Sequence, residues 1–597
     1  MRAFCGLMAV VAVLGWGAGA EPPEIIPLAQ VQPGMAGYGL TVVAGEEPSR
    51  FEVEVIGVLD EPGTANDFII VRVSGEAIAR SGGIAQGMSG SPVYLEGKLA
   101  GALSRAALWS AQPDRPLGLV TPIEPMLEVL SEFKPPTQPE EPQKLPVPKE
   151  LEKLGISGVV LCQAPPSQPV GALLYAWPVQ SPIVTQGLSP RTLEVLSQGV
   201  SLDLVDHPFL RLRPAWRDGI PGLRGPGVGR IVQAPGGARD DAGARFVPGG
   251  AVGVGLLTGD VTIGALGTVT LVEGDALLAF GHPFLFTGRS DYFLTSAYIF
   301  DTVAALDAPY KLGTLGGSQG TVLADRWAAI GGLLGRNPSP IDLNFSIWDE
   351  SRGTGEELAA QMVRERGLEE LLYYLAGLEA TDRALDRIGP GTATVRYTIF
   401  GSGLPRPLTR HNVFLSTSDI AVYVPWEAAI VTDILEYNEF ADPGLMAISL
   451  DANVTEDFSA VEVLDLEVDK DRYLPGDTVQ FTVYLQDWRG ELSAWSGELP
   501  LPPDLDTPYL EVRAYGGPRT PEKGEGYPVI ASLEDLVDYL EGVPSYDTLT
   551  VEVFALDPIS ELMGEPWLYG VSDTSVSVGQ AVVYGQVSLI VPFGKAK

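Results

Sequence analysis

Apolar and polar positions alternate along much of the chain, and this alternation predicts a protein built mainly from β-strands. Phe51, Val53 and Val55 alternate with two glutamates, which is the period of a strand with one solvent-facing side. The nearly continuous apolar run at 68–73 predicts a strand that is covered on both faces. We therefore expect residues 21–133 to form a β-barrel half.

A glycine-rich loop at 82–92 precedes a predicted β-hairpin. The apolar runs 93–95 and 99–103 lie on either side of Glu96 and Gly97, a pair that favours a tight turn between two strands. The hairpin would hold the end of the glycine-rich loop in a fixed position.

A second group of strands is predicted after residue 248. Turns that contain Gly or Asp separate four apolar runs, at 252–257, 261–265, 268–272 and 276–280. This spacing is typical of another barrel-like sheet, which we place at 248–345.

Two regions of different composition separate the predicted barrels. Residues 134–149 contain six prolines among charged residues, which indicates an extended linker at 134–154. Residues 155–247 are predicted to be a mixed α/β segment, with a strand near Val159 and a helix at 189–198.

The region after the second barrel is predicted to contain a helix followed by strands. Thr354 and Glu357 have the spacing of a capping box, in which two side chains satisfy the free N–H groups at a helix start. We therefore expect a helical segment at 346–390 and strands at 391–455.

The C-terminal region, 456–597, is predicted to be an immunoglobulin-like β-sandwich. Apolar and polar residues alternate at 461–468 and again at 479–485, and a Pro-Gly-Asp turn lies between them.

The charge balance narrows the possible partners. The 597-residue chain has 39 Lys and Arg against 76 Asp and Glu, a formal net charge of −37. A surface of this sign repels nucleic acid and anionic lipid, so we expect neither as a partner.

The composition also bears on the fold. The 70 glycines and 50 prolines favour strands and turns over long helices.

The first twenty residues have the pattern of a secretory signal peptide. Arg2 provides the positive charge at the start, and an apolar stretch follows at 7–16. The small residues that end at Ala20 form the expected cleavage site. We expect an exported chain that begins at Glu21 and functions in the periplasm or outside the cell. No later run approaches the about 18 apolar residues of a membrane span, so no stable span is expected. Cys162 is then the only cysteine, which excludes an internal disulfide.

Ser89 is the candidate nucleophile. It lies between glycines, where main-chain N–H groups can turn inward to stabilise an oxyanion, and we assign this role to Gly87 and Ser89. A predicted strand follows the serine directly, which favours chymotrypsin-type geometry over the helix that follows an α/β-hydrolase nucleophile. A tight structural turn is the alternative interpretation of this loop.

Three histidines are available as a general base. His282 is favoured because it ends a predicted hairpin, whereas His207 has the same Pro-Phe-Leu flank but lies in a predicted loop. His411 is predicted to be a surface or strand-start residue. A structural role at the strand end is the alternative for His282. Since no two histidines have ligand spacing, we expect no metal site, and no cofactor is indicated.

Two sequence motifs resemble a known peptidase family. The run at 81–103 resembles the signature of the stage IV sporulation protein B (SpoIVB) serine peptidase family, and Gly281 with His282 resembles its base motif. The resemblance covers roughly 27–130 and 248–335.

The resemblance implies an acyl-enzyme mechanism in which Ser89 is the nucleophile, His282 is the base, and the substrate is a protein or peptide. Two features depart from the family: the serine precedes the histidine along the chain, and Ser74 stands where the family has an aspartate. Without a carboxylate the site would be a Ser–His dyad or inactive. Possible third members are Glu76, Asp67 and Asp291.

The predicted fold class is therefore mainly β, with two chymotrypsin-like β-barrel halves, a short helical segment and a C-terminal immunoglobulin-like sandwich. The predicted function is that of an exported serine endopeptidase. The alternative is a catalytically inactive, peptidase-like scaffold or binding protein of the cell envelope. The sequence does not indicate the oligomeric state.

Overall fold

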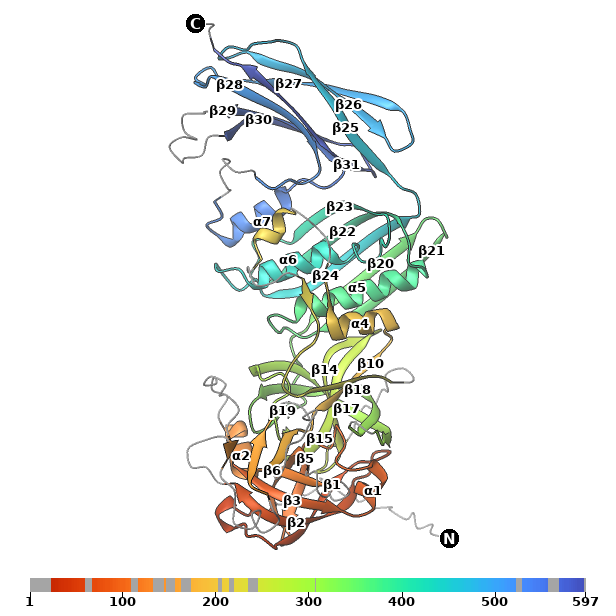
Figure 1. Cartoon of the computed structure of the whole chain (residues 1–597), viewed down its shortest axis with the longest axis vertical. Coiled ribbons are helices and arrows are strands. Elements are labelled where there is room, and N and C mark those ends of the chain that lie inside the picture. The colour runs from red at the N-terminus through yellow and green to blue at the C-terminus, as the bar shows by residue number, and fades with distance from the viewer. Residues whose placement is uncertain are drawn as a thin grey trace, which may run out of the picture.

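Two rings of β-strands, a sheet covered by helices and a β-sandwich follow one another along the chain (Figure 1). The computed structural model describes residues 23–59, 67–108, 116–131, 144–145, 156–162, 173–201, 207–213, 219–234, 245–305, 308–521, 529–556 and 568–594. The expected signal peptide and most of the expected linker lie outside the described residues. The described part is mainly β, as the sequence predicts.

Six strands form the first barrel. The order β4-β1-β2-β3-β6-β5 closes on itself because β4 also pairs with β5. The predicted alternation is confirmed in β2, where Phe51, Val53 and Val55 are buried in the barrel core and the intervening glutamates are exposed. The strands are β1 (Ala36–Thr41), β2 (Ser49–Leu59), β3 (Phe68–Ser74), β4 (Ser91–Leu95), β5 (Lys98–Leu108) and β6 (Leu117–Pro122).

Short helices connect and extend this barrel. They are η1 (Leu28–Gln30), α1 (Glu76–Ser81) and α2 (Ile123–Ser131). Helix α1 ends at Gly82, whose φ of +72° is left-handed and favours glycine. The glycine-rich loop begins there and leads into the β4–β5 hairpin, which the sequence predicts.

The second barrel is also a closed ring of six strands. The order β15-β16-β19-β18-β17-β14 closes because β14 pairs with β15. The runs predicted at 261–265 and 268–272 form one strand, because the ring of Phe280 occupies the space beside Gly267 and pairing with β14 continues past this glycine. The strands are β14 (Ala251–Gly259), β15 (Thr262–Glu273), β16 (Ala276–Ala279), β17 (Gly288–Val303), β18 (Tyr310–Asp325) and β19 (Ile330–Leu334).

The intermediate segment connects the two barrels. Strand β9 (Leu173–Pro178) pairs with β5 of the first barrel, and β10 (Ser181–Gln186) pairs with β15 of the second. Val179 and Gln180, between these strands, therefore lie where the barrels meet.

The intermediate segment also contains the predicted helix. It is α4 (Pro190–Gln198), whose N-terminus is capped by the Ser189 side chain. The other elements are β7 (Lys144–Leu145), β8 (Gly158–Leu161), β11 (Gly199–Val200), η2 (Pro208–Arg211), β12 (Ile220–Pro221) and β13 (Val228–Gln233).

The sheet that forms the second barrel continues beyond β14 into a region of five further strands. Its order is β21-β20-β24-β22-β23, and helices α5 and α6 lie on one face (Figure 1). The elements are β20 (Ile341–Asp349), β21 (Thr354–Met362), α5 (Glu369–Leu385), β22 (Gly391–Gly401), β23 (Leu408–Ser416), α6 (Trp426–Glu436) and β24 (Leu445–Thr455).

The predicted capping box at Thr354 and Glu357 is wrong. Both residues belong to strand β21, which pairs with β20 along its length and with β14 at its end. Alternate burial of Leu358, Ala360 and Met362 shows the period of a strand, and pairing on two sides outweighs the local helix signal. The helix predicted in this region begins later, at Glu369.

The C-terminal region consists of two four-stranded sheets with a shared apolar core. The predicted strands at 461–468 and 479–485 are confirmed, and their sheet has the order β27-β26-β25-β31. The second sheet is β30-β29-β28-β32. The elements are β25 (Ala460–Val468), β26 (Thr478–Asp487), β27 (Leu492–Pro500), β28 (Tyr509–Gly516), α7 (Leu533–Gly542), β29 (Thr548–Leu556), β30 (Leu568–Ser577), β31 (Val582–Tyr584) and β32 (Gln586–Pro592).

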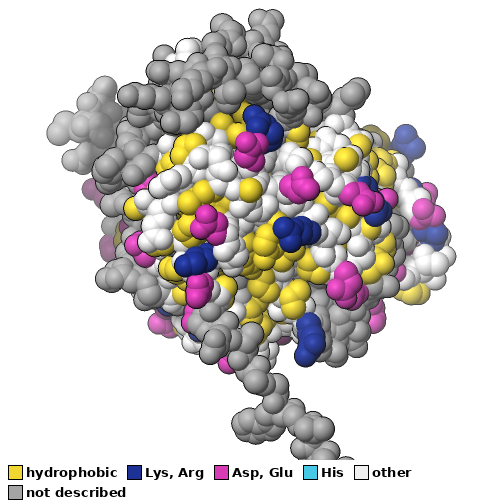
Figure 2. All heavy atoms as spheres, turned by 90° about the horizontal axis from the view of Figure 1, so that it is seen from below, with side chains coloured by type: hydrophobic (Ala, Val, Ile, Leu, Met, Phe, Trp, Pro, Cys, Tyr) yellow, Lys and Arg dark blue, Asp and Glu magenta, His cyan; other side chains and the backbone are white. Residues whose placement is uncertain are grey.

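The face below the first barrel has a mixed surface. Figure 2 shows a band of apolar side chains there, with acidic and basic side chains scattered on both sides of it. Within the described residues, no helix has the length and apolar character needed to cross a membrane.

Candidate active site

Ser89 lies where the glycine-rich loop of the first barrel contacts the second barrel. Gly87 and Gly90 have φ values of +89° and +90°, which favour glycine at both positions. A Cβ on Gly90 would lie only 2.1 Å from the carbonyl oxygen of Thr268, so the two chains approach too closely for any side chain there. Ser89 is 0% exposed, and its Oγ has no hydrogen-bond partner among the described residues.

Strand β15 fixes the main chain of this loop through three hydrogen bonds. The Thr268 N–H donates to the Ser89 carbonyl oxygen at 2.9 Å, and the Thr268 hydroxyl donates to the Gly87 carbonyl oxygen at 2.8 Å. The Thr270 hydroxyl donates to the Gly90 carbonyl oxygen at 2.7 Å. The position of Ser89 therefore depends on the second barrel as well as on its own hairpin.

The two predicted oxyanion donors differ in their hydrogen bonding. The Gly87 N–H donates to the Gln180 carbonyl oxygen at 3.2 Å. The Ser89 N–H has no main-chain acceptor within the described part of the chain. The Ser89 N–H is therefore not engaged by a described main-chain acceptor, whereas Gly87 would have to separate from Gln180 before it could donate to an oxyanion.

His282 follows strand β16 closely and is buried. Its Nδ1 lies 2.7 Å from the carbonyl oxygen of Pro283, and its Nε2 lies 2.9 Å from that of Val179. Burial lowers its pKa to about 4, although both carbonyl contacts favour the protonated ring. The structure brings His282 to the barrel junction, but both ring nitrogens lie within hydrogen-bond distance of main-chain oxygens, to one of which the neutral ring donates, and neither contacts Ser89.

None of the three possible third members bonds to the His282 ring, because both ring nitrogens already contact main-chain oxygens. Glu76 is exposed in the first turn of α1, and Asp67 directly precedes β3. Asp291 accepts a hydrogen bond from the Ser339 N–H. The Ser74 hydroxyl is exposed and donates to Glu52.

A carboxylate that the sequence analysis did not identify holds the loop after His282. Asp325, at the end of β18, is fully buried and accepts 2.7 Å hydrogen bonds from the N–H groups of Phe284, Leu285 and Phe286. It acts on the backbone of the loop, not on the His282 ring.

A second buried charged residue that the sequence analysis did not identify is Lys311, near the start of β18. It is 0% exposed, and its Nζ donates to the Thr268 hydroxyl at 2.9 Å. Burial lowers its pKa to about 7. The sequence contains no motif that relates Lys311 to Ser89, because the two residues belong to different barrels.

The other two histidines and Cys162 lie away from this loop. His207 caps η2 and packs among Phe209, Trp426 and Tyr546 near Glu427.

His411 lies inside β23 and is half-buried, not at a strand start. Cys162 is half-buried against the Ala176 carbonyl oxygen, and burial raises the pKa of its thiol. These contacts are typical of structural residues.

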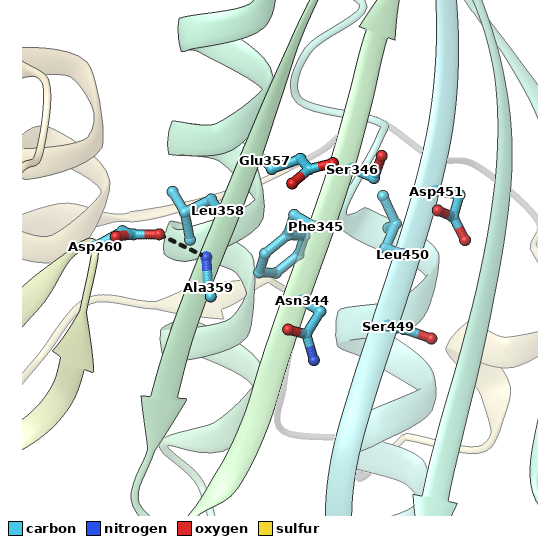
Figure 3. Close-up of a pocket in the computed structure, with 10 residues that line it drawn as sticks. All are labelled: Asp260, Asn344, Phe345, Ser346, Glu357, Leu358, Ala359, Ser449, Leu450 and Asp451. Atoms are coloured by element: carbon cyan, nitrogen blue, oxygen red, sulfur yellow. Dashed lines mark hydrogen bonds between the residues drawn. The ribbon is translucent and has the colours of Figure 1, made fainter.

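A separate shallow hollow of about 340 Å³ lies on the open face of the five-stranded region. Figure 3 shows Asn344 and Ser346 of β20, Glu357 of β21 and Asp451 of β24 around it. Asp260 belongs to the same surface and accepts a hydrogen bond from the Ala359 N–H at 2.8 Å. None of the residues of the Ser89 site lines this hollow.

By fold and site, this is a two-barrel protein with a buried serine where the barrels meet. Residues 18–127 match the family described as SpoIVB peptidase S55, so this part of the chain is a domain of that serine peptidase family. The match includes Ser89 and the first barrel but does not extend to His282 or Lys311. No curated protein and no solved structure matches the chain.

Proposed function

We propose that the protein is an exported serine endopeptidase that uses Ser89 as its nucleophile. The observation that supports this most directly is the Ser89 hydroxyl itself: it is buried, has no hydrogen-bond partner among the described residues, and lies in a loop whose glycines and interbarrel bonds fix its main chain. Buried hydroxyl groups are ordinarily hydrogen-bonded, and a catalytic role is one of the explanations for an exception.

In the proposed reaction, Ser89 Oγ attacks the carbonyl carbon of a peptide bond and forms an acyl-enzyme, which water then hydrolyses. The N–H groups of Ser89 and Gly87 stabilise the oxyanion, the latter after leaving Gln180. The candidate base is His282, from the family motif, whose ring would first have to leave one of the main-chain oxygens that it faces. The two barrels would form a chymotrypsin-like pair around this site, and the C-terminal sheets an immunoglobulin-like sandwich.

The test is labelling with a fluorophosphonate probe, which reacts with activated serines. The protein would be the chain that starts at Glu21, compared with Ser89→Ala and with Ser91→Ala. Ser91 is the matched control, because it belongs to the same loop but donates its hydroxyl to the Met88 carbonyl oxygen. We expect labelling of the wild type and of S91A, and none of S89A. A folded wild type that does not react would contradict the proposal.

A second candidate function is that of an inactive, peptidase-like scaffold. Two observations favour it: Ser89 is 0% exposed, and the Gly87 N–H already donates a hydrogen bond to the Gln180 carbonyl oxygen. A folded wild type that does not react with the probe but binds proteins of the cell envelope would support this function.

Mass spectrometry of the N-terminus of the secreted chain tests the proposed export and cleavage after Ala20.

A further inference from the structure

We propose that the open face of the five-stranded region binds a neutral saccharide at its shallow hollow of about 340 Å³. This binding site is separate from Ser89 and does not depend on the proposed peptidase function. Its volume is near the lower end of the range of ligand pockets, and most of the side chains around it are polar. A hollow of this size suits a small polar ligand or one unit of a longer chain.

Five neighbouring strands each bring one polar residue into a single row across this face. The cross-strand register places Ser346 of β20 between Glu357 of β21 and Asp451 of β24, and Figure 3 shows these three side chains. Arg396 of β22 lies opposite Asp451, and His411 of β23 lies opposite Arg396. Because neighbouring strands are about 4.8 Å apart, the row is roughly 19 Å long. A chain of several sugar rings can therefore lie along it.

The polar side chains that line the hollow on these strands have no partner within the described part of the chain. None of them forms a hydrogen bond or an ion pair with a described residue; they are Asn344, Ser346, Glu357, Ser449 and Asp451. Polar residues beside the hollow do bond across the strands. Gln361 donates to Asp342, and the hydroxyl groups of Thr398 and Thr409 lie 3.1 Å apart. The unpaired groups are therefore grouped at the hollow, where a ligand can bond to them.

These side chains have the hydrogen-bonding capacity that the hydroxyl groups of a saccharide require. The carboxylates of Glu357 and Asp451 only accept, the Arg396 guanidinium only donates, and the Asn344 amide does both. Each sugar hydroxyl group donates one hydrogen bond and accepts others, so adjacent hydroxyl groups can satisfy all of these side chains together. An apolar ligand would instead remove their water and leave them without partners.

Trp348 provides an apolar surface beside the row. It comes two residues after Ser346 in β20, so its side chain lies on the same face, and it is 48% exposed. The residue opposite it in β21 is Gly355, and a Cβ there would lie 2.8 Å from Cε3 of the indole. The indole therefore extends over Gly355, where no side chain lifts it from the sheet. The C–H face of a sugar ring can stack on such an indole, whose ring is apolar and whose N–H is polar.

Other classes of ligand fit the hollow less well. The carboxylates of Asp260, Glu357 and Asp451 disfavour nucleotides and other anions. Within the described residues, no group of three or more His, Cys, Asp and Glu side chains is arranged to hold a metal ion. A peptide that binds as an added strand needs a free strand edge, but β20 and β24 are each paired on both sides. A neutral saccharide needs neither a counter-charge nor a strand edge.

The experiment is affinity electrophoresis in native gels that contain a soluble polymer, with the chain that starts at Glu21. The neutral probes are hydroxyethylcellulose, mixed-linkage β-glucan, galactomannan and soluble starch. Polygalacturonate is the anionic probe, and polylysine is the probe for a basic peptide. Mobility in each gel is compared with mobility in a gel without polymer, so that differences in charge between variants cancel.

The variants are Trp348→Ala and Asp451→Ala, each with a matched control. Trp488→Ala is the control for the indole, because Trp488 lies between β26 and β27 and is 47% exposed. Glu350→Ala is the control for the carboxylate, because Glu350 is exposed directly after β20 and does not line the hollow. Circular dichroism establishes that each variant is folded.

We expect at least one neutral polysaccharide to retard the wild type, and polygalacturonate not to do so. W348A and D451A should each weaken the apparent affinity by about 10-fold or more, because one loses the stacked ring and the other loses hydrogen bonds to a charged group. W488A and E350A should be retarded as strongly as the wild type.

A wild type that none of the four neutral polysaccharides retards would overturn the inference. Equal retardation of W348A, D451A and the wild type would also overturn it, because the saccharide would then bind elsewhere on the protein. Retardation by polylysine and by no neutral polysaccharide would assign the hollow to a basic peptide instead. None of these outcomes bears on Ser89, whose reactivity is measured separately with the fluorophosphonate probe.

Discussion

The main-chain N–H of Thr268 donates a 2.9 Å hydrogen bond to the carbonyl oxygen of Ser89, and this contact joins the glycine-rich loop of one barrel to a central strand of the other. Neither barrel alone therefore holds the candidate site. The family match ends at residue 127, within α2, so the strand of the second barrel that bonds to the Ser89 loop lies in a part of the chain that the match does not include. The interface between barrels is where stability and reactivity should be most closely linked.

Substitution of Gly90 by alanine should disrupt this interface. The added methyl group would lie 2.1 Å from the Thr268 carbonyl oxygen and 2.4 Å from the Phe280 nitrogen, and both neighbours are backbone atoms that cannot move independently. We expect a loss of roughly 3 kcal/mol or more in the free energy of unfolding, together with loss of labelling.

Gly97→Ala is the matched control for this prediction. Gly97 also has a positive φ, +82°, but nothing lies within 4 Å of the position of its Cβ. The Gly97→Ala substitution should lower the free energy of unfolding by only about 1 kcal/mol, because of backbone strain. If urea unfolding showed the same loss of free energy for G90A and G97A, the close contact between the barrels at Gly90 would not be rigid.

Replacement of Asp325 by asparagine should destabilise the loop that contains His282. The carboxylate accepts N–H groups on both of its oxygens, whereas the amide group of asparagine presents N–H to some of the same donors. We expect a loss of roughly 2–4 kcal/mol in unfolding measurements. Asp342→Asn, at an exposed position of β20, should have almost no effect.

Lys311→Met should stabilise the fold in acid and neutral solution. The pKa of Lys311 is lowered by burial to about 7 from 10.5, so the unfolded chain binds the proton more tightly than the folded chain. The free energy of unfolding of the wild type should therefore rise with pH between about 7 and 10, by up to about 1.4 kcal/mol per pH unit. The advantage of K311M should be largest below pH 7 and shrink above it. Parallel stability curves for the two proteins would contradict this interpretation.

Glu369 gives the opposite dependence on pH. Burial, with a further contribution from Glu436, raises its pKa to about 8 from 4.5, so the folded chain holds the proton more tightly than the unfolded chain. Its contribution to stability is present below about pH 4.5 and is lost as the pH rises to 8. Glu369→Gln should therefore resemble the wild type at pH 4.5 and be more stable at pH 8. The exposed substitution Glu350→Gln should not change the difference between the two pH values.

Local chemistry was sufficient to predict much of the secondary structure and to indicate Ser89 as the candidate nucleophile. The period-two pattern in β2 and the apolar run of β3 reflect which faces are buried, and both are visible in the order of residues. The Glu96-Gly97 turn adopts positive φ at both positions, as a tight hairpin requires. Ser89 was identified because glycines on both sides are unusual unless the main chain must turn or approach another chain.

The failures have two causes, and in the first of them tertiary pairing outweighs local preference. Thr354 and Glu357 have a helix-start pattern, yet strands on both sides of β21 provide hydrogen bonds that a helix would forgo. Helix α6, which was not predicted, is buried at every position, so it lacks the amphipathic period that marks surface helices.

The sequence by itself determined the β-rich architecture, the glycine-rich loop and the serine within it, because these depend on backbone freedom and on the alternation of buried faces. Only the tertiary structure decided what surrounds the serine. Thr268, Lys311 and Asp325 come from strands distant in the chain, and their roles arise from burial and from hydrogen bonds between the barrels. From the sequence alone, a lysine is expected to be a solvated charge, and its pKa falls toward 7 only when folding removes water from its amine, as it does for Lys311.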